Sequence, residues 1–191
     1  MGVFKITGYH GTDKSVADAI LRDGFVCKQN TEHWLGNGIY FFADESLAKW
    51  WATNPTQKHG VRITEPAIIE CLIEADEQRV LNLCSLDAYQ PYVKRYNEFT
   101  KSWIRAYRVK NEINFRQLRC LFFDYLFTLY DIDVIIAPFL KPDQPYMPPF
   151  HDNSFSDQMH IMYTEVQICV HPEKQEVIKS KVLKEVNHEN N

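Results

Sequence analysis

The sequence predicts an α+β fold, a single domain in which helices pack over split antiparallel or mixed β-sheets. Its 191 residues are enough for one ordinary domain but few for two, and the 45% hydrophobic content is typical of a globular protein. Strand-like and helix-like segments follow one another in a mixed order, which suits this class. We expect the domain to span residues 1–185 and a C-terminal tail to span residues 186–191.

The elements follow from local periodicity and from turn-forming residues between them. In chain order they are a strand at 3–10, a helix at 15–22, a strand or tight bend at 35–42, a helix between Asp44 and Asn54, strands at 67–75 and 80–83, helices within 85–130, a strand at 132–139, a long loop at 141–160 and a strand at 161–170. The last dozen residues are expected to form a frayed helix or tail.

End signals and burial patterns justify the elements. Asp13 is a plausible N-cap for the helix at 15–22, and Gly24 fits its C-terminal stop. The runs at 67–75 and 132–139 are continuously apolar, as in buried strands, and residues 115–130 are rich in Leu, Phe and Tyr. The segment 141–160 has no apolar period, so it is either a functional or a disordered loop.

The charge is uneven along the chain. The formal net charge is −4, which by itself argues against a general nucleic-acid coat protein. Residues 92–110, however, hold six cations against Glu98 alone, a local +5, with aromatic residues between them. The favoured interpretation is an amphipathic helix with Phe99, Trp103 and Tyr107 toward the core, and a nucleic-acid contact is the alternative.

The five cysteines are widely spaced, lie in apolar segments and form no zinc motif, so we expect reduced, buried thiols and no metal. The first residues lack a signal-peptide pattern, and the longest apolar run, from Val134, is too short to cross a membrane. We therefore expect a cytoplasmic protein without membrane partners, or one secreted into a host cell by a route that needs no signal peptide.

Three segments carry residues suited to chemistry. His10 and Gly11 stand where a strand gives way to a helix, the two glycines Gly36 and Gly38 precede a run of aromatics, and a late strand bears Glu165 and Gln167 on one face. Taken singly, the first two favour structural roles, a hydrogen-bonding histidine and a β-bulge. The third is equally compatible with a solvated edge strand.

Together these segments resemble the ADP-ribosyltransferase superfamily. The resemblance rests on His10-Gly11-Thr12, a helix ending in a "dGF" turn, Gly36-x-Gly38-Ile39-Tyr40-Phe41 and a late strand bearing a glutamate. It is nearest to the His-Tyr-Glu branch shared by diphtheria toxin and the poly(ADP-ribose) polymerases. It covers the first 52 residues well and the last strand moderately. It implies an ADP-ribosyltransferase-like domain built around an NAD cleft.

The resemblance also implies roles. His10 and the Gly11 backbone would hold the adenosine-side ribose and the nicotinamide amide of NAD, and Tyr40 would stack on the nicotinamide ring. Glu165 would bond the ribose 2′-hydroxyl and stabilise the cation that forms as nicotinamide departs. The residues implied to line the cofactor are His10, Gly11, Thr12, Gly38, Tyr40 and Phe41.

Some assignments stay open at this point. Gln167 fits the catalytic slot as well as Glu165 does, but only the glutamate supplies negative charge, so the chemistry favours Glu165. Trp50 or Trp51 would supply the second aromatic face typical of the branch. The loop at 141–160 would meet the acceptor.

The implied function is mono-ADP-ribosylation, with NAD as substrate, no metal, and a protein or RNA/DNA acceptor. A microbial or phage effector or toxin is the expected context, with an antitoxin or inhibitor as a possible partner. The alternative is a catalytically inactive module of the same fold that binds NAD, ADP-ribose or a partner. Release of nicotinamide from NAD distinguishes the two.

Overall fold

The computed structural model describes residues 2–53, 63–107, 114–139 and 164–186. Their elements are β1 (Val3–Asp13), α1 (Lys14–Asp23), β2 (Ile39–Phe42), α2 (Glu45–Thr53), β3 (Pro66–Asp76), the short 3-10 helix η1 (Glu77–Arg79), β4 (Val80–Asn82), α3 (Leu86–Tyr107), α4 (Phe115–Tyr130), β5 (Val134–Phe139), β6 (Glu165–Val170), the 3-10 helix η2 (Gln175–Val177) and β7 (Ile178–Glu185). The α+β class is confirmed.

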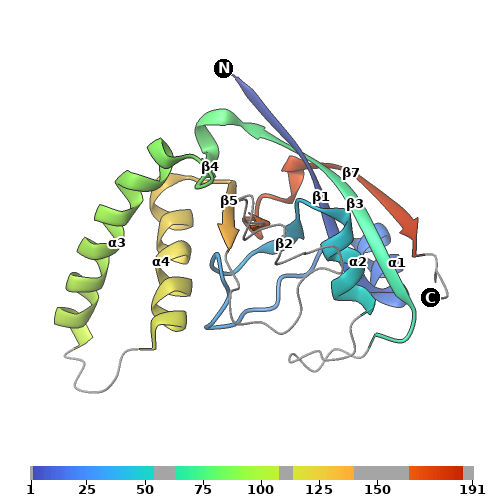
Figure 1. Ribbon diagram of the computed structural model, residues 1–191, viewed down its shortest axis with the longest axis horizontal. Coiled ribbons are helices and arrows are strands. Elements are labelled where there is room, and N and C mark those ends of the chain that lie inside the picture. The colour runs from blue at the N-terminus through green and yellow to red at the C-terminus, as the bar shows by residue number, and fades with distance from the viewer. Residues whose placement is uncertain (1, 54–62, 108–113, 140–163, 187–191) are drawn as a thin grey trace, which may run out of the picture.

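The strands form one mixed sheet in the order β4-β5-β6-β2-β1-β3-β7. The pair β4–β5 is parallel and every other pair in this order is antiparallel. Helices α3 and α4 stand at the β4–β5 end, whereas α1 and α2 lie beside β1, β3 and β7 (Figure 1). The sheet therefore brings strands from both ends of the chain to its centre.

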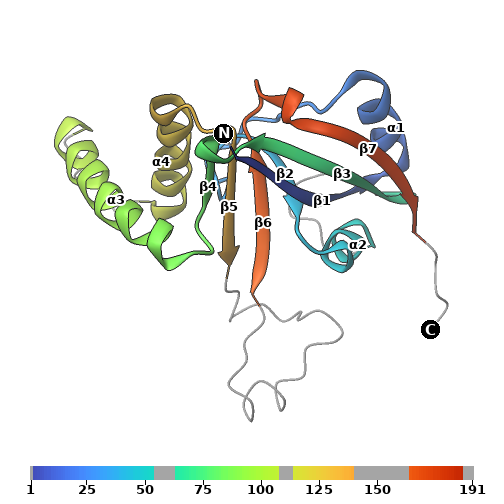
Figure 2. The ribbon, with the colours of Figure 1, turned by 90° about the horizontal axis from the view of Figure 1, so that it is seen from above.

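A seam divides this sheet between β1 and β2. All 11 residues of β1 pair with β3, but β1 meets β2 in register only at Tyr9 and Phe42. The strands on the two sides of the seam run in clearly different directions, with β5 and β6 crossing the line of β1, β3 and β7 (Figure 2). The sequence predicted split sheets, whereas the structure has one seven-stranded sheet in which two strand groups meet at one residue pair.

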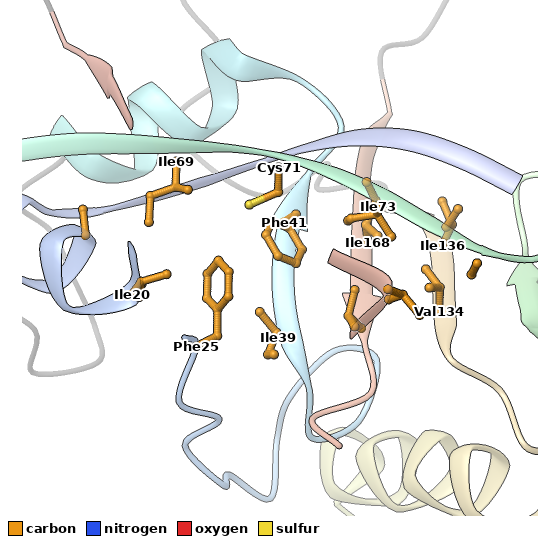
Figure 3. Packing of buried hydrophobic residues seen from close by; sticks show 14 of the residues in the cluster. Ile20, Phe25, Ile39, Phe41, Ile69, Cys71, Ile73, Val134, Ile136 and Ile168 are labelled. Carbon is orange, nitrogen blue, oxygen red and sulfur yellow. The ribbon is translucent and has the colours of Figure 1, made fainter. Parts of the chain in front are cut away.

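Two apolar clusters fill the space on the two sides of the sheet. In the first, Phe25 and Phe41 pack edge to face with ring centroids 5.3 Å apart (Figure 3). Ile39 of β2 and Ile69 and Ile73 of β3 belong to the same cluster. In the second, α4 places Phe122 and Leu126 against β5 and β6. Alternation along β6 sends Ile168 to the first cluster and Cys169 to the second.

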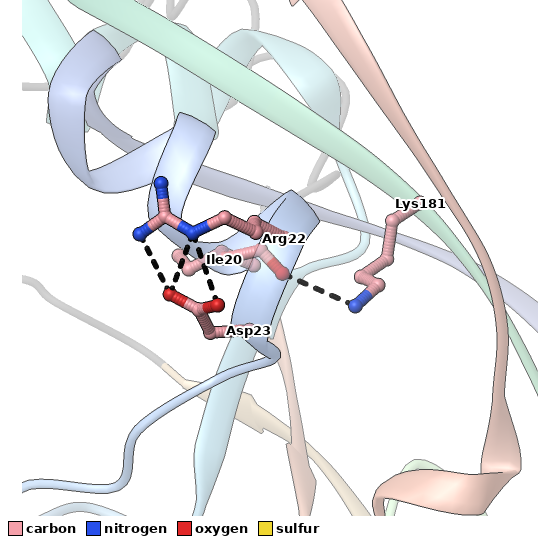
Figure 4. A network of polar contacts seen from close by, with 4 residues as sticks. All are labelled: Ile20, Arg22, Asp23 and Lys181. Atoms are coloured by element: carbon pink, nitrogen blue, oxygen red, sulfur yellow. Dashed lines mark hydrogen bonds and ion pairs between the residues drawn. The ribbon is translucent and has the colours of Figure 1, made fainter.

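Helix α1 has the ends that the sequence predicts. The Asp13 carboxylate accepts a hydrogen bond from Ser15 N (3.0 Å), and Gly24 adopts a positive φ of 91° at the C-terminus. The Ile20 carbonyl near this end accepts from Gly24 N (3.0 Å) and from the Lys181 ammonium of β7 (3.1 Å), beside the Arg22–Asp23 pair (Figure 4). The helix is thus fixed to both β1 and β7.

Helix α3 is amphipathic, as expected. Tyr92, Tyr96 and Phe99 pack against the second cluster, and the Phe99 ring lies 5.2 Å from that of Tyr125 in α4. Lys94, Lys101 and Arg105 of the same helix are exposed. Arg95 does stack on aromatic rings, with its guanidinium carbon 5.0 Å from the Tyr92 centroid and 4.3 Å from the Tyr130 centroid. Arg108 and Lys110 lie outside the described residues.

Three expectations need correction. Residues 180–185, expected to belong to a frayed helix or tail, are part of β7, which pairs with β3; residues 187–191 lie outside the described residues. The alternation of charged and apolar residues there allows either an amphipathic helix or an edge strand, and only the free edge of β3 decides. Cys84 is exposed, because it follows β4 in a turn, whereas Cys71, Cys120 and Cys169 are buried as expected.

The strand that bears Glu165 is not an edge strand. Strand β6 lies between β5 and β2, and Glu165 and Gln167 are both buried. In the described part of the chain, no helix is long and apolar enough to span a bilayer.

Candidate functional site

Three adjacent strands carry the residues that the sequence singled out. His10 lies on β1, Tyr40 on β2 and Glu165 on β6, and these strands are neighbours in the sheet. Tyr9, Phe42 and Gln167 form one row across them, so their side chains share a face. The three strands are thus neighbours, but alternation along each strand places the His10 side chain on the face opposite to that of Glu165 and Gln167.

His10 bridges the seam of the sheet. Its Nδ1 lies 2.8 Å from the Tyr40 carbonyl oxygen, and because a carbonyl only accepts, Nδ1 must carry the proton. The ring packs on Phe25 and Phe41, with centroids 5.3 and 6.0 Å away. Burial lowers the pKa of His10, which favours the neutral imidazole with an acceptor at Nε2. The hydrogen-bonding histidine expected from the residue alone is therefore present.

Gly11 and Thr12 complete the strand that carries His10. A Cβ on Gly11 would lie 2.1 Å from the Ala48 carbonyl oxygen of α2, so only glycine lets this helix approach the strand so closely. Thr12 is 7% exposed and pairs with Ala67 of β3. The close approach brings the α2 backbone directly over the Gly11 backbone.

The tryptophans expected to supply an aromatic face lie on this same helix. The Trp51 ring is 6.3 Å from Phe42 and 6.5 Å from Trp50. Phe42 is followed by Ala43, whose N–H donates to the Val166 carbonyl (3.0 Å). Helix α2 therefore begins next to the start of β6, close to where Glu165 stands.

Glu165 and Gln167 form a buried polar pair at the start of β6. They are 7% and 8% exposed, and the Gln167 amide donates a hydrogen bond to one carboxylate oxygen of Glu165. Two positions apart on a strand, they point to the same face, as predicted. The amide thus fixes the orientation of the acid. A carboxylate held in this way at low exposure is well suited to stabilise a cation on a bound substrate.

Tyr40 lies on the opposite face of the sheet from His10. Its hydroxyl accepts from Leu35 N and donates to the Gly36 carbonyl, each at 2.7 Å, which closes the bend at 33–38 that precedes β2. Its ring packs against the second apolar cluster. Burial raises the pKa of the phenol, so the hydroxyl remains protonated. The structure therefore commits both ends of this side chain to holding the bend.

The remaining predicted cofactor residues contribute backbone rather than side chains. Phe41 is 1% exposed within the first cluster. A Cβ on Gly38 would come within 2.3 Å of the Cys169 Sγ and 2.7 Å of the Val170 carbonyl oxygen. Gly38 is thus required for β2 to pack on β6. Any contact of these two residues with a ligand would be through main-chain atoms.

One interaction that holds the bend, the pair of hydrogen bonds between Asn37 and Asp124, was not predicted from the sequence. Asp124 of α4 accepts from Asn37 N (2.5 Å) and Asn37 Nδ2 (2.8 Å), and Asn37 Oδ1 accepts from Asn30 N (2.8 Å). Gly36 has a φ of 80°, which a glycine adopts without strain. The signal in the sequence was Asn37 between two glycines, but its partner lies 87 residues away.

A shallow pocket lies between this bend and α4. Its volume is about 170 Å³, and its walls include the amides of Gln29, Asn30 and Asn37. His10, Tyr40 and Glu165 do not line it. It is smaller than the sites that enclose whole cofactors, which hold roughly 300–1,000 Å³. The loop at 141–160, expected to meet the acceptor, lies outside the described residues.

Comparison with known proteins gives a relative but no activity. No protein-family model matches the chain. An uncharacterized protein of Methanocaldococcus jannaschii is 22% identical over 182 residues, an alignment that covers 89% of this chain and 84% of the relative. The two chains are therefore similar along most of their lengths.

Proposed function

We propose that this protein is an NAD-dependent mono-ADP-ribosyltransferase, which cleaves the nicotinamide–ribose bond of NAD and passes ADP-ribose to a macromolecular acceptor. One observation carries the proposal. Glu165, whose buried carboxylate accepts a hydrogen bond from the Gln167 amide, is the first residue of β6, which pairs with β2. On the other side of β2 lies β1, whose His10 is hydrogen-bonded to the Tyr40 carbonyl of β2. The proposal assigns to these three neighbouring strands the roles that the resemblance to the His-Tyr-Glu branch implies.

The nicotinamide end of NAD would lie beside Gly11 and the start of β6, at the edge of the close contact between β1 and α2. The Gly11 backbone offers main-chain hydrogen-bonding groups, and the contact with Ala48 brings α2 to it. Trp50 or Trp51 on that helix would provide the aromatic face for the nicotinamide ring. Tyr40, committed to the bend, would act as a positioning residue instead.

Glu165 would act on the ribose. When the C1′–N bond breaks, its electron pair leaves with the pyridinium nitrogen, nicotinamide departs neutral, and the ribose becomes an oxocarbenium-like cation. The carboxylate would accept the 2′-hydroxyl proton in a hydrogen bond and stabilise this cation. The acceptor nucleophile then bonds to C1′ and loses its proton. Gln167, which donates to one oxygen of Glu165, would hold the acid in place.

His10 would hold the ribose at the adenosine end. With the proton on Nδ1 engaged by the Tyr40 carbonyl, a neutral ring presents an acceptor at Nε2. A ribose hydroxyl is a donor of the matching kind. The lowered pKa of His10 favours this neutral form over imidazolium near neutral pH.

Release of nicotinamide from NAD, followed by chromatography, tests the proposal. We expect Glu165→Gln, which keeps the shape but removes the charge, to lower the rate by roughly 100-fold or more. Gln167→Ala should lower it less, because the charge remains. Glu173→Gln changes an exposed glutamate outside the site and serves as the control. Tight binding of ADP-ribose by a wild-type protein that releases no nicotinamide would instead establish the inactive binding module.

A further inference from the structure

A second cluster of functional groups lies on the other side of Glu165. Arg119 of α4 has its guanidinium carbon 4.6 Å from the centroid of the Trp34 ring. Trp34 in turn meets Phe139 edge to face, with centroids 4.6 Å apart. Phe139 is the cross-strand partner of Glu165 in the β5–β6 ladder. A continuous path of contacts therefore leads from the guanidinium to the candidate catalytic acid.

The charge of Arg119 is not balanced within the described part of the chain. Arg22, Arg79 and Arg116 each lie within 4 Å of a carboxylate oxygen, whereas none of the described carboxylates forms an ion pair with Arg119. Arg119 is partly buried, its Nε is buried, and that atom has no hydrogen-bond partner among the described residues. Burial lowers the pKa of this guanidinium. Such a cation is unfavourable unless an anion from outside joins it.

The geometry leaves the guanidinium ready to bind an anion. Stacking on Trp34 uses the face of the group, and the two terminal Nη groups, unlike the buried Nε, would supply a planar, bidentate contact. Phosphate oxygens match this fork of donors. Trp34 itself is held in place, because the adjoining Leu35 and Gly36 are bonded to the Tyr40 hydroxyl. The site is thus preformed.

We propose that Arg119 and Trp34 form a phosphate-binding subsite beside Glu165. The inference rests on the proposed transferase function. Gly11 and α2, assigned to nicotinamide, lie on the β2 side of β6, and Phe139 lies on the β5 side. The subsite therefore faces the acid from the direction opposite to the leaving group, where an acceptor approaches. It would hold a phosphate of a phosphate-bearing acceptor. The diphosphate of NAD is the other source of the same group.

Binding of ADP and inorganic pyrophosphate, with adenosine as the uncharged reference, tests the subsite without requiring turnover. By titration calorimetry we expect Arg119→Met to weaken both phosphate ligands by roughly tenfold or more and to leave adenosine unchanged. Arg119→Lys should give an intermediate loss, since it keeps the charge but not the fork. Arg116→Met, an exposed arginine on the same helix, is the matched control. Unchanged phosphate binding in a folded Arg119→Met protein would overturn the proposal.

Kinetics then distinguish the two sources of phosphate. If the subsite holds the acceptor, Arg119→Met reduces transfer to a 5′-phosphorylated oligonucleotide more than transfer to the same oligonucleotide without the phosphate. A higher KM for NAD in the same variant would instead assign the subsite to the diphosphate. A protein that binds pyrophosphate through Arg119 but releases no nicotinamide would keep the subsite and refute the transferase.

Discussion

The two strand groups of the sheet differ in how they are held together. The group β1–β3–β7 rests on long ladders, with all 11 residues of β1 paired to β3. The group β4–β5–β6–β2 is built from strands of three to six residues and depends on α4 and the bend at 33–38 for its packing. The candidate site draws His10 and Gly11 from the first group and Glu165 from the second.

The difference shows where the geometry of the site is set. Between β1 and β2 the described contacts include one residue pair and the hydrogen bond from His10 to Tyr40. The relative position of the two groups thus depends on a few identifiable contacts rather than on a long ladder. Changes at these contacts should affect the site more than equal changes within either group.

The largest expected effect follows from Gly11. In Gly11→Val the new Cβ would lie 2.1 Å from a backbone atom of α2, so the helix must move away from β1. We expect the free energy of unfolding to fall by at least about 3 kcal/mol, as measured by urea denaturation. Gly2→Ala is the control, because its Cβ meets only the flexible end of Glu77. Equal stability of the two variants would show that α2 is not held as described.

The second expected effect concerns the bend at 33–38. Asp124→Ala removes two hydrogen bonds to Asn37 and leaves its backbone N–H without this partner. We expect a loss of about 2–3 kcal/mol in the free energy of unfolding. Asp87→Ala, which removes an exposed carboxylate of α3, should cost less. If Asp124→Ala is as stable as the wild type, the bend does not depend on α4.

A change at the seam between β1 and β2 should have a smaller but measurable effect on the free energy of unfolding. His10→Phe keeps an aromatic ring between Phe25 and Phe41 but removes the donor to the Tyr40 carbonyl. We expect a loss of about 1–2 kcal/mol in urea denaturation. Phe25→Leu, a packing change in the same cluster, separates loss of the hydrogen bond from loss of ring contacts.

The same histidine predicts a pH dependence. The pKa of His10 is lowered in the folded state, so the unfolded chain binds a proton first as the pH falls below the ordinary value of about 6.5. This contribution to stability is fully present above that pH and declines as the pH falls toward the folded-state pKa. Urea midpoints at pH 7.5 and 5.5 should differ more in the wild type than in His10→Phe. Parallel losses in both proteins would contradict it.

The smallest expected effect is a difference in local unfolding between the two strand groups, β1–β3–β7 and β4–β5–β6–β2. Cys71 lies on β3, and Cys169 lies on β6; both are buried, whereas Cys84 is exposed. Maleimide labelling followed by mass spectrometry should modify Cys84 first. In mild urea, Cys169 should react before Cys71, because the shorter ladders of its group open more easily. The reverse order would show that β1–β3–β7 is the less stable part.

Local signals predicted much of the fold. Asp13 and Gly24 marked the ends of α1, and apolar runs located β3 and β5, because caps and burial patterns act within a few residues. The shared face of Glu165 and Gln167 followed from strand alternation alone. By contrast, β7 was missed, since its sequence is compatible with a helix until the edge of β3 is present.

Apart from β7, the elements and the candidate residues could be predicted from the chain alone, since they depend on backbone preferences and on local spacing. What those residues face is set by the packing of the folded chain. It committed Tyr40 to a bend, placed His10 on the opposite face, and set Arg119 on Trp34 beside the strand of Glu165. These outcomes depend on which strands and helices become neighbours. That choice is made by packing between residues far apart in the chain.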